Sequence, residues 1–188
     1  MTAAIAQGPT DTPLLEETIG DNLAATVARF PDREALVVPH QDIRQTWSEF
    51  SATVDAVAKG LMGTGVAKGD RVGMWSPNYA EWVYIQYATA KVGAIQVNIN
   101  PAYRTTELEY ALKQSGCRML VTRSEYLMSA YREMVEEVQD GLPALVDVVY
   151  FDTDDWAALI AAGSSVSDAD LAERAASLDT NDAINIQY

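Results

Sequence analysis

Three β-prone runs determine the fold that we expect for this chain: RVGMWS at 71–76, AIQVNI at 94–99 and CRMLVT at 117–122. They begin at residues 71, 94 and 117, so each starts 23 residues after the run before it. Helix-forming sequence lies between them, and strand–helix–strand units of this length are typical of a parallel sheet with helices on its faces. The sequence therefore predicts an α/β fold built on a mostly parallel sheet flanked by helices.

The segments between and after these strands contain signals for helix starts. Ser76-Pro77 is a favourable N-cap and first helical position, which predicts a helix over 78–92. A threonine cap predicts a second helix over 105–115, and a serine cap at Ser124 predicts a third from 125 to about 139. A glycine follows each of the first two predicted helices, as is common at helix ends.

Upstream of the sheet, apolar residues at helical spacing predict a helix over 19–29. Two β-prone runs at 34–38 and 43–47 flank a turn and predict a hairpin. TWSE at 46–49 has the form of a capping box and predicts a helix that ends at Gly63-Thr64-Gly65. These glycines follow a helix rather than a strand, which disfavours a dinucleotide-binding motif.

Downstream of residue 122, the pattern predicts two further strands and two short helices, at 146–151, 183–188, 155–162 and 168–177 respectively. Residues 1–17 are polar and rich in threonine and proline, which is typical of a flexible leader. We therefore expect a leader over 1–17 and one α/β unit over 18–188.

The chain of 188 residues carries 27 acidic and 13 basic residues, a formal net charge of −14. A surface this negative repels phosphate backbones and anionic lipid headgroups, so we expect no nucleic-acid partner. No uncharged apolar run reaches the roughly 18 residues of a membrane span. The first residues lack the basic and apolar regions of a signal peptide. These features favour a cytoplasmic protein without a transmembrane segment.

Cys117 and His40 are the single cysteine and the single histidine of the chain. An intrachain disulfide and a cysteine–histidine metal cluster are therefore excluded. His40 lies in a turn-forming segment, and we interpret it as a surface residue rather than a catalytic one. Cys117 begins a predicted buried strand and is interpreted as a small apolar residue. No pair of carboxylates is placed for general acid–base catalysis.

One loop has the features of a ligand contact. NINPAYR at 98–104 runs out of a predicted strand at its carboxyl end, where open α/β sheets bind ligands. Arg104 supplies a cation, and the free N–H groups at the start of the next helix face the same way. These features predict an anion or nucleotide contact. The competing interpretation is a loop shaped by asparagine and proline turn chemistry, and the residues taken alone leave both open.

Several stretches of the chain occur in a recognisable order: TWSEF at 46–50 with GVAKGDRV at 65–72, KVGA at 91–94 running into NINPAYR at 98–104, and ELEYAL at 107–112 with SGC at 115–117. In order and spacing they resemble the N-terminal region of the AMP-forming acyl-CoA synthetases, within the adenylate-forming superfamily. The resemblance covers about 19–188. The NPAYR form is more similar to the medium- and long-chain fatty-acid ligases than to the amino-acid adenylating domains.

The resemblance implies a piece of the large N-terminal domain of an enzyme that joins a carboxylate to ATP, releases pyrophosphate and passes the acyl group to CoA. A fatty acid would be the substrate, and ATP, Mg²⁺ and CoA would bind the parent enzyme. In such enzymes a strand like 184–188 leads into a Ser/Thr/Gly-rich loop that ends in lysine and cradles the ATP phosphates. That loop and the C-terminal domain lie outside this sequence. We therefore expect the fragment to be inactive and to bind none of these ligands well.

The resemblance also implies a small set of binding residues, with no catalytic or metal-binding residue in this sequence. Close to the path of CoA we expect the loop residues Asn100, Ala102, Tyr103 and Arg104. A helix starting at Ser124 would flank the CoA nucleotide, with Arg123 and Arg132 as the nearest cations. Tyr188 would border the phosphate loop.

Two functions from different classes remain open. The chain is either the N-terminal part of a fatty-acid–CoA ligase or a stand-alone, non-catalytic α/β module that binds a partner or CoA. Ile184, Ile186 and Tyr188 would form an unprotected sheet edge, which favours the enzyme fragment. Neither the acyl chain length nor the oligomeric state can be predicted from this sequence.

Overall fold

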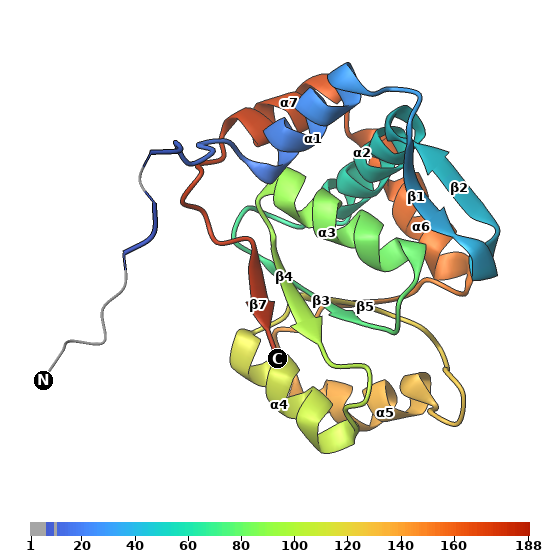
Figure 1. Ribbon diagram of the computed structural model, residues 1–188. Coiled ribbons are helices and arrows are strands. Elements are labelled where there is room, and N and C mark those ends of the chain that lie inside the picture. The colour runs from blue at the N-terminus through green and yellow to red at the C-terminus, as the bar shows by residue number, and fades with distance from the viewer. Residues whose placement is uncertain (1–6, 10) are drawn as a thin grey trace, which may run out of the picture.

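A computed structural model describes residues 7–9 and 11–188, and Figure 1 shows their arrangement. The leader expected over 1–17 falls partly on residues 1–6 and 10, which lie outside the described residues. Its other residues contain neither helix nor strand. The first helix begins at Ile19, one residue after the expected start of the α/β unit at residue 18.

The centre of the fold is a five-stranded, entirely parallel sheet with the strand order β6-β5-β3-β4-β7. Its strands are β3 (Arg71–Trp75), β4 (Ile95–Ile99), β5 (Met119–Thr122), β6 (Asp147–Tyr150) and β7 (Asn185–Gln187). The register pairs Trp75 with Ile99 on one side and with Thr122 on the other. The predicted parallel sheet is confirmed, and the carboxyl ends of its strands share one edge.

Helices cover both faces of this sheet (Figure 1). The first face carries α1 (Ile19–Arg29), α2 (Trp47–Gly63), α3 (Ala80–Val92), α6 (Asp154–Ala162) and α7 (Asp168–Ala176). The second face carries α4 (Thr105–Ser115) and α5 (Tyr131–Val138). Each face has its own apolar core, because alternate strand side chains point to opposite faces. Val72 and Met74 belong to the first core, whereas Val97 and Leu120 belong to the second.

The segment that precedes the sheet folds as predicted. The strands β1 (Glu34–Val38) and β2 (Ile43–Thr46) pair antiparallel around a short 3-10 turn at Pro39–Gln41. At the start of α2, Thr46 and Glu49 form the predicted capping box. The Thr46 N–H donates to Glu49 Oε2 at 2.8 Å, and the Glu49 N–H donates to Thr46 Oγ1 at 3.3 Å.

The predicted start of the helix over 78–92 is wrong by two residues. The helix α3 begins at Ala80, and Ser76 is not its cap, because the Ser76 hydroxyl donates to the Pro77 carbonyl at 2.8 Å. The Ala80 N–H donates instead to Gln41 Oε1 at 2.8 Å. A side chain of the hairpin turn therefore caps this helix, and no local pattern at 76–80 could indicate it.

The predicted caps of the next two helices are also wrong. Thr105 is the first residue of α4, and Glu107 accepts the Arg104 N–H at 3.1 Å. The helix α5 begins at Tyr131 rather than at residue 125. Ser124 is held elsewhere, because its N–H and its hydroxyl each donate to the Asp152 carboxylate at 2.8 Å.

The other predicted elements are confirmed with small shifts at their ends, including β6, β7, α6 and α7. Two further 3-10 turns lie at Gln139–Gly141 and Gly163–Ser165. Within the described ranges, no helix combines the length and the apolar character needed to cross a bilayer.

Candidate functional site at the carboxyl edge of the sheet

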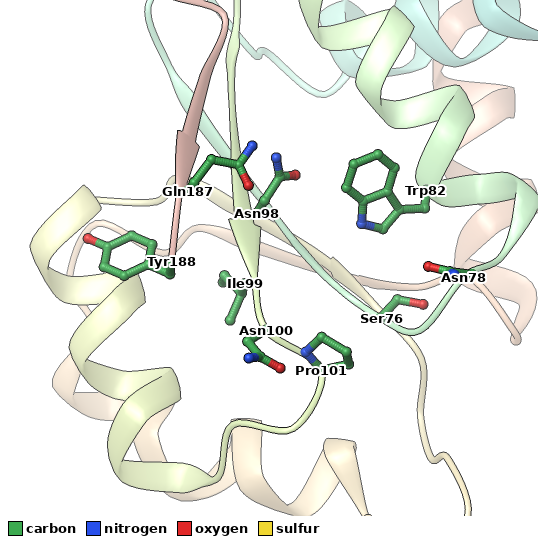
Figure 2. Close-up of a pocket in the computed structure, with 9 residues that line it drawn as sticks. All are labelled: Ser76, Asn78, Trp82, Asn98, Ile99, Asn100, Pro101, Gln187 and Tyr188. Atoms are coloured by element: carbon green, nitrogen blue, oxygen red, sulfur yellow. The ribbon is translucent and has the colours of Figure 1, made fainter.

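The carboxyl ends of β3, β4 and β7 meet at a pocket of about 370 Å³ (Figure 2). The strand order places these three strands side by side, so residues far apart in the sequence line one hollow. The lining residues are Ser76, Asn78, Trp82, Asn98, Ile99, Asn100, Pro101, Gln187 and Tyr188. Ligands of open α/β sheets bind at this edge, which makes the pocket the candidate site.

Neutral amide side chains provide most of the polar lining. Asn78, Asn98, Asn100 and Gln187 each offer N–H donors and a carbonyl acceptor. Asn98 and Gln187 are paired neighbours on β4 and β7, and Figure 2 shows Trp82 of α3 across from them. Such a lining can hydrogen-bond a polar ligand group, but its side chains include no carboxylate, imidazole, amine or thiol for proton transfer.

A buried amide lies beneath this lining. Gln96 is fully buried on β4, and its Nε2 donates to Oδ1 of Asn98. Gln96 Oε1 has no hydrogen-bond partner among the described residues. Because Asn98 Oδ1 accepts this bond, the side-chain N–H groups of Asn98 remain available to other partners.

Turn chemistry shapes the predicted ligand loop at 100–104. Asn100 Oδ1 accepts the Ala102 N–H at 2.9 Å, and the Asn100 carbonyl accepts the Tyr103 N–H at 3.0 Å. The interpretation as an asparagine turn is therefore confirmed. It does not compete with ligand binding, because Asn100, Pro101 and Ala102 keep exposed surfaces. Tyr103 is half-buried and packs against the core beneath α4 and α5.

Two aromatic side chains support this loop from the second face of the sheet. The indole N–H of Trp75 donates to the Asn100 carbonyl at 3.1 Å. The hydroxyl of Tyr131 donates to the Pro101 carbonyl at 2.8 Å. The backbone of the loop is thus tied to the last residue of β3 and to the first residue of α5.

The three predicted cations lie outside the pocket and differ in their surroundings. Arg104 is exposed and donates to Ser129 Oγ at 2.7 Å. The Arg132 guanidinium lies 3.8 Å from the centroid of the Tyr150 ring. Arg123 is already engaged, because its guanidinium pairs with the Asp152 carboxylate at 3.3 Å and donates to the Tyr79 hydroxyl. Within residues 7–9 and 11–188, neither Arg104 nor Arg132 has a carboxylate at ion-pair distance.

Tyr188 lies at the pocket, directly after β7. Its N–H donates to the Asn98 carbonyl at 3.0 Å, and its hydroxyl donates to Gln114 Oε1 at 2.7 Å. The side chain is half-buried, with its ring edge against Tyr110. The carboxyl end of β7 is therefore fixed against both β4 and α4.

Of the sequence-predicted residues, the structure brings Asn100 and Tyr188 together at the pocket and leaves Ala102, Tyr103, Arg104 and Arg132 outside it. Sequence reasoning did not single out Gln187, which lies inside a strand, or Trp82 of α3, and it included Asn98 only as the first residue of the stretch at 98–104. The sequence offered one signal for the pocket, because Ser76, Asn100 and Tyr188 each directly follow the end of a strand.

Neither His40 nor Cys117 lines this pocket. Among the described residues, no group of three or more His, Cys, Asp or Glu could hold a metal ion. His40 is exposed in the hairpin turn, as expected, with its ring edge against Tyr79. Cys117 is buried, and desolvation raises the pKa of its thiol to about 11. A thiol of this pKa is not a nucleophile at neutral pH.

Comparison with known proteins identifies the family of this chain. The sequence profile described as AMP-binding enzyme matches residues 23–188, which is most of the chain. This chain belongs to the AMP-binding enzyme family. The resemblance seen in the stretches around NINPAYR is therefore confirmed, and the pocket is the carboxyl-edge pocket of a member of that family.

Several curated proteins are similar to this AMP-binding chain over almost its whole length. The medium-chain acyl-CoA ligase ACSF2, mitochondrial, of Homo sapiens is 40% identical over 201 residues, which cover 97% of this chain and 33% of the relative. That of Mus musculus is 39% identical over 204 residues with the same coverage. The putative acyl-CoA synthetase YngI of Bacillus subtilis is 36% identical over 93% of this chain and 35% of its own length. The chain spans about a third of the length of these relatives.

Solved structures agree with the fold. A Mycobacterium tuberculosis fatty acyl CoA synthetase superposes with a TM-score of 0.69 at 24% identity, over 91% of this chain and 32% of that chain. The anthranilate CoA ligase AuaEII, solved in complex with anthranoyl-AMP, superposes with a TM-score of 0.66 at 30% identity. That match covers 75% of this chain and 26% of the ligase. The parallel sheet with helices on both faces is thus the fold found at corresponding positions in adenylate-forming enzymes.

Proposed function

We propose that this chain is the N-terminal part of a fatty-acid–CoA ligase. The parent enzyme would join a fatty acid to ATP, release pyrophosphate, and pass the acyl group from AMP to the CoA thiol. The observation that carries this proposal is the match to acyl-CoA ligases over 97% of the chain at 39% and 40% identity. A match of this extent leaves almost no part of the chain for an unrelated function.

We infer that the chain alone is inactive. The pocket side chains offer hydrogen bonds but no carboxylate, imidazole, amine or thiol, and the described residues contain no group of three or more His, Cys, Asp or Glu that could hold a metal ion. In the family that the sequence resembles, the loop that cradles the ATP phosphates follows a strand like β7. We therefore place the contacts to ATP and Mg²⁺ in sequence that follows Tyr188, whose backbone is fixed at the pocket by β4.

The residues of this chain offer a contact suited to the phosphates of CoA. CoA is a polyanion, and Arg104 is an exposed cation without a carboxylate partner in the described part of the chain. The adjacent start of α4 is less available than its sequence indicates, because the Glu107 carboxylate already accepts the Arg104 N–H. We therefore assign the phosphate contact to the guanidinium of Arg104 and a supporting polar contact to the exposed Asn100.

The experiment compares the 188-residue chain with the product of the complete reading frame that contains it. Each protein is incubated with ATP, Mg²⁺, CoA and saturated fatty acids of graded chain length. Pyrophosphate and acyl-CoA are both measured. We expect both products from the complete protein and neither from the 188-residue chain.

Three outcomes would contradict these proposals. A complete protein that releases no pyrophosphate with any carboxylate would favour the alternative function, a non-catalytic α/β binding module. Pyrophosphate release without acyl-CoA would leave adenylation but remove CoA as the acceptor. Acyl-CoA formation by the 188-residue chain would show that the inferred inactivity is wrong.

A further inference from the structure

Trp75 and Tyr131 form a stacked pair beneath the loop at 100–104. Their ring centroids are 4.0 Å apart and their planes differ by 16°. Trp75 is 0% exposed and Tyr131 is 1% exposed. The backbone of Trp75 is also fixed, because the Thr122 hydroxyl donates to its carbonyl at 2.7 Å. Side chains packed this closely have little room to move, so the pair is a rigid base for whatever it contacts.

Each ring of the pair donates one hydrogen bond to the loop above it. Trp75 Nε1 binds the Asn100 carbonyl at 3.1 Å, and the Tyr131 hydroxyl binds the Pro101 carbonyl at 2.8 Å. Burial raises the pKa of the Tyr131 hydroxyl, so it stays protonated and remains a donor at physiological pH. Two consecutive carbonyls of the loop are thus held by two donors that do not titrate in that range.

The loop needs such anchors because its outer side faces solvent. Asn100, Pro101 and Ala102 are exposed, and an exposed loop with few buried contacts is mobile unless its backbone is tied down. The donors need the loop equally, since a buried N–H or O–H without an acceptor is costly. The stacked pair and the loop therefore fix each other's geometry.

We propose that the Trp75–Tyr131 pair positions the loop at 100–104 for contact with CoA. This inference rests on the proposed function. Both side chains are buried and act through the carbonyls of Asn100 and Pro101, so they are positioning residues that do not touch the ligand. Loss of the Tyr131 hydroxyl should therefore weaken the use of CoA and leave the formation of the acyl-adenylate intact.

The test is Tyr131→Phe in the complete protein, which removes the hydroxyl and keeps the stacked ring. We expect the KM for CoA to rise about 3- to 10-fold, as for the loss of one hydrogen bond between neutral groups. The KM for ATP and the rate of carboxylate-dependent pyrophosphate exchange should stay unchanged. Hydrogen exchange at the Ala102 and Tyr103 amides should become faster, because the Pro101 carbonyl, next to their acceptor Asn100, loses its hydrogen bond.

Tyr84→Phe is the matched control. Tyr84 is also a buried tyrosine, 5% exposed, and its hydroxyl donates to Gln45 Oε1 at 2.9 Å on the opposite face of the sheet. Its removal should lower stability to a similar degree without a change in the KM for CoA. The comparison separates a positioning role from a general loss of stability.

Equal CoA KM values for Tyr131→Phe and the wild-type protein would overturn the inference. So would equal increases in Tyr131→Phe and Tyr84→Phe, because the effect would then be one of stability. Unchanged exchange at the Ala102 and Tyr103 amides would also overturn it. A wild-type protein without CoA-dependent activity would instead contradict the proposed function, so the two failures are distinguishable.

Discussion

At the scale of single residues, the surroundings of each cation decide what it can still bind. Lys59, Arg118 and Arg123 are held in ion pairs and keep little capacity for another anion. Arg104 differs from them, since it is exposed and its guanidinium donates to the neutral Ser129 hydroxyl. In a chain of net charge −14, such a cation beside a carboxyl-edge loop is suited to an anionic ligand.

Arg104→Ala in the complete protein should raise the KM for CoA by about 10- to 150-fold, because a hydrogen bond to a charged group contributes about 1.5–3 kcal/mol. The KM for ATP should not change. Arg44→Ala serves as the control, since Arg44 is another exposed arginine and pairs with Glu34 in the hairpin. Similar CoA KM values in the two variants would show that Arg104 does not contact CoA.

At the scale of elements, local sequence signals located the strands and most helix ends but misplaced the starts of α3 and α5. A strand is recognised from its own apolar residues, so β3 to β7 lie where they were expected. A helix start depends on whichever group reaches its free N–H groups. For α3 that group is Gln41, and before α5 the Asp152 carboxylate binds Ser124, so both boundaries depend on contacts between distant segments.

The sequence likewise did not predict the close packing of α2 against α6. A Cβ on Gly60 would lie 2.5 Å from the Leu159 carbonyl oxygen, and a Cβ on Gly63 would lie 2.2 Å from the carbonyl oxygen of Ala162. Both obstacles are backbone atoms, so the helices would have to separate. These glycines allow the close approach, whereas the sequence indicated only that glycine ends the helix.

Gly60→Ala should lower the free energy of unfolding by about 1–3 kcal/mol, because overpacking outweighs the better helix propensity of alanine. Gly20→Ala is the matched control in α1, where the nearest atoms to the added Cβ lie at 3.7 Å. That variant should be neutral or slightly more stable. Chemical denaturation of both variants measures the difference, and equal stabilities would show that α2 and α6 do not require the close contact.

At the scale of the whole molecule, strand order creates the candidate site. The sequence predicted a parallel sheet, but it did not indicate that β7 returns to lie beside β4. That adjacency places Gln187 next to Asn98 and brings Tyr188 to the pocket that Asn100 also lines. The loop at 100–104 was predictable because it follows one strand directly. The amide lining was not, because it exists only where three strands meet.

The chain spans about a third of the length of its curated relatives. Its described residues supply a pocket edge and a supported loop. We interpret the fold as a scaffold that presents β7 and the loop at 100–104 to the remainder of a ligase.

The most direct test of this account is the nucleotide sequence that follows the codon for Tyr188. We predict an open reading frame that encodes, within about a dozen codons, a run rich in glycine, serine and threonine that ends in lysine, as a phosphate-binding loop requires. A stop codon directly after Tyr188, or a continuation without such a run, would contradict the assignment to a fatty-acid–CoA ligase.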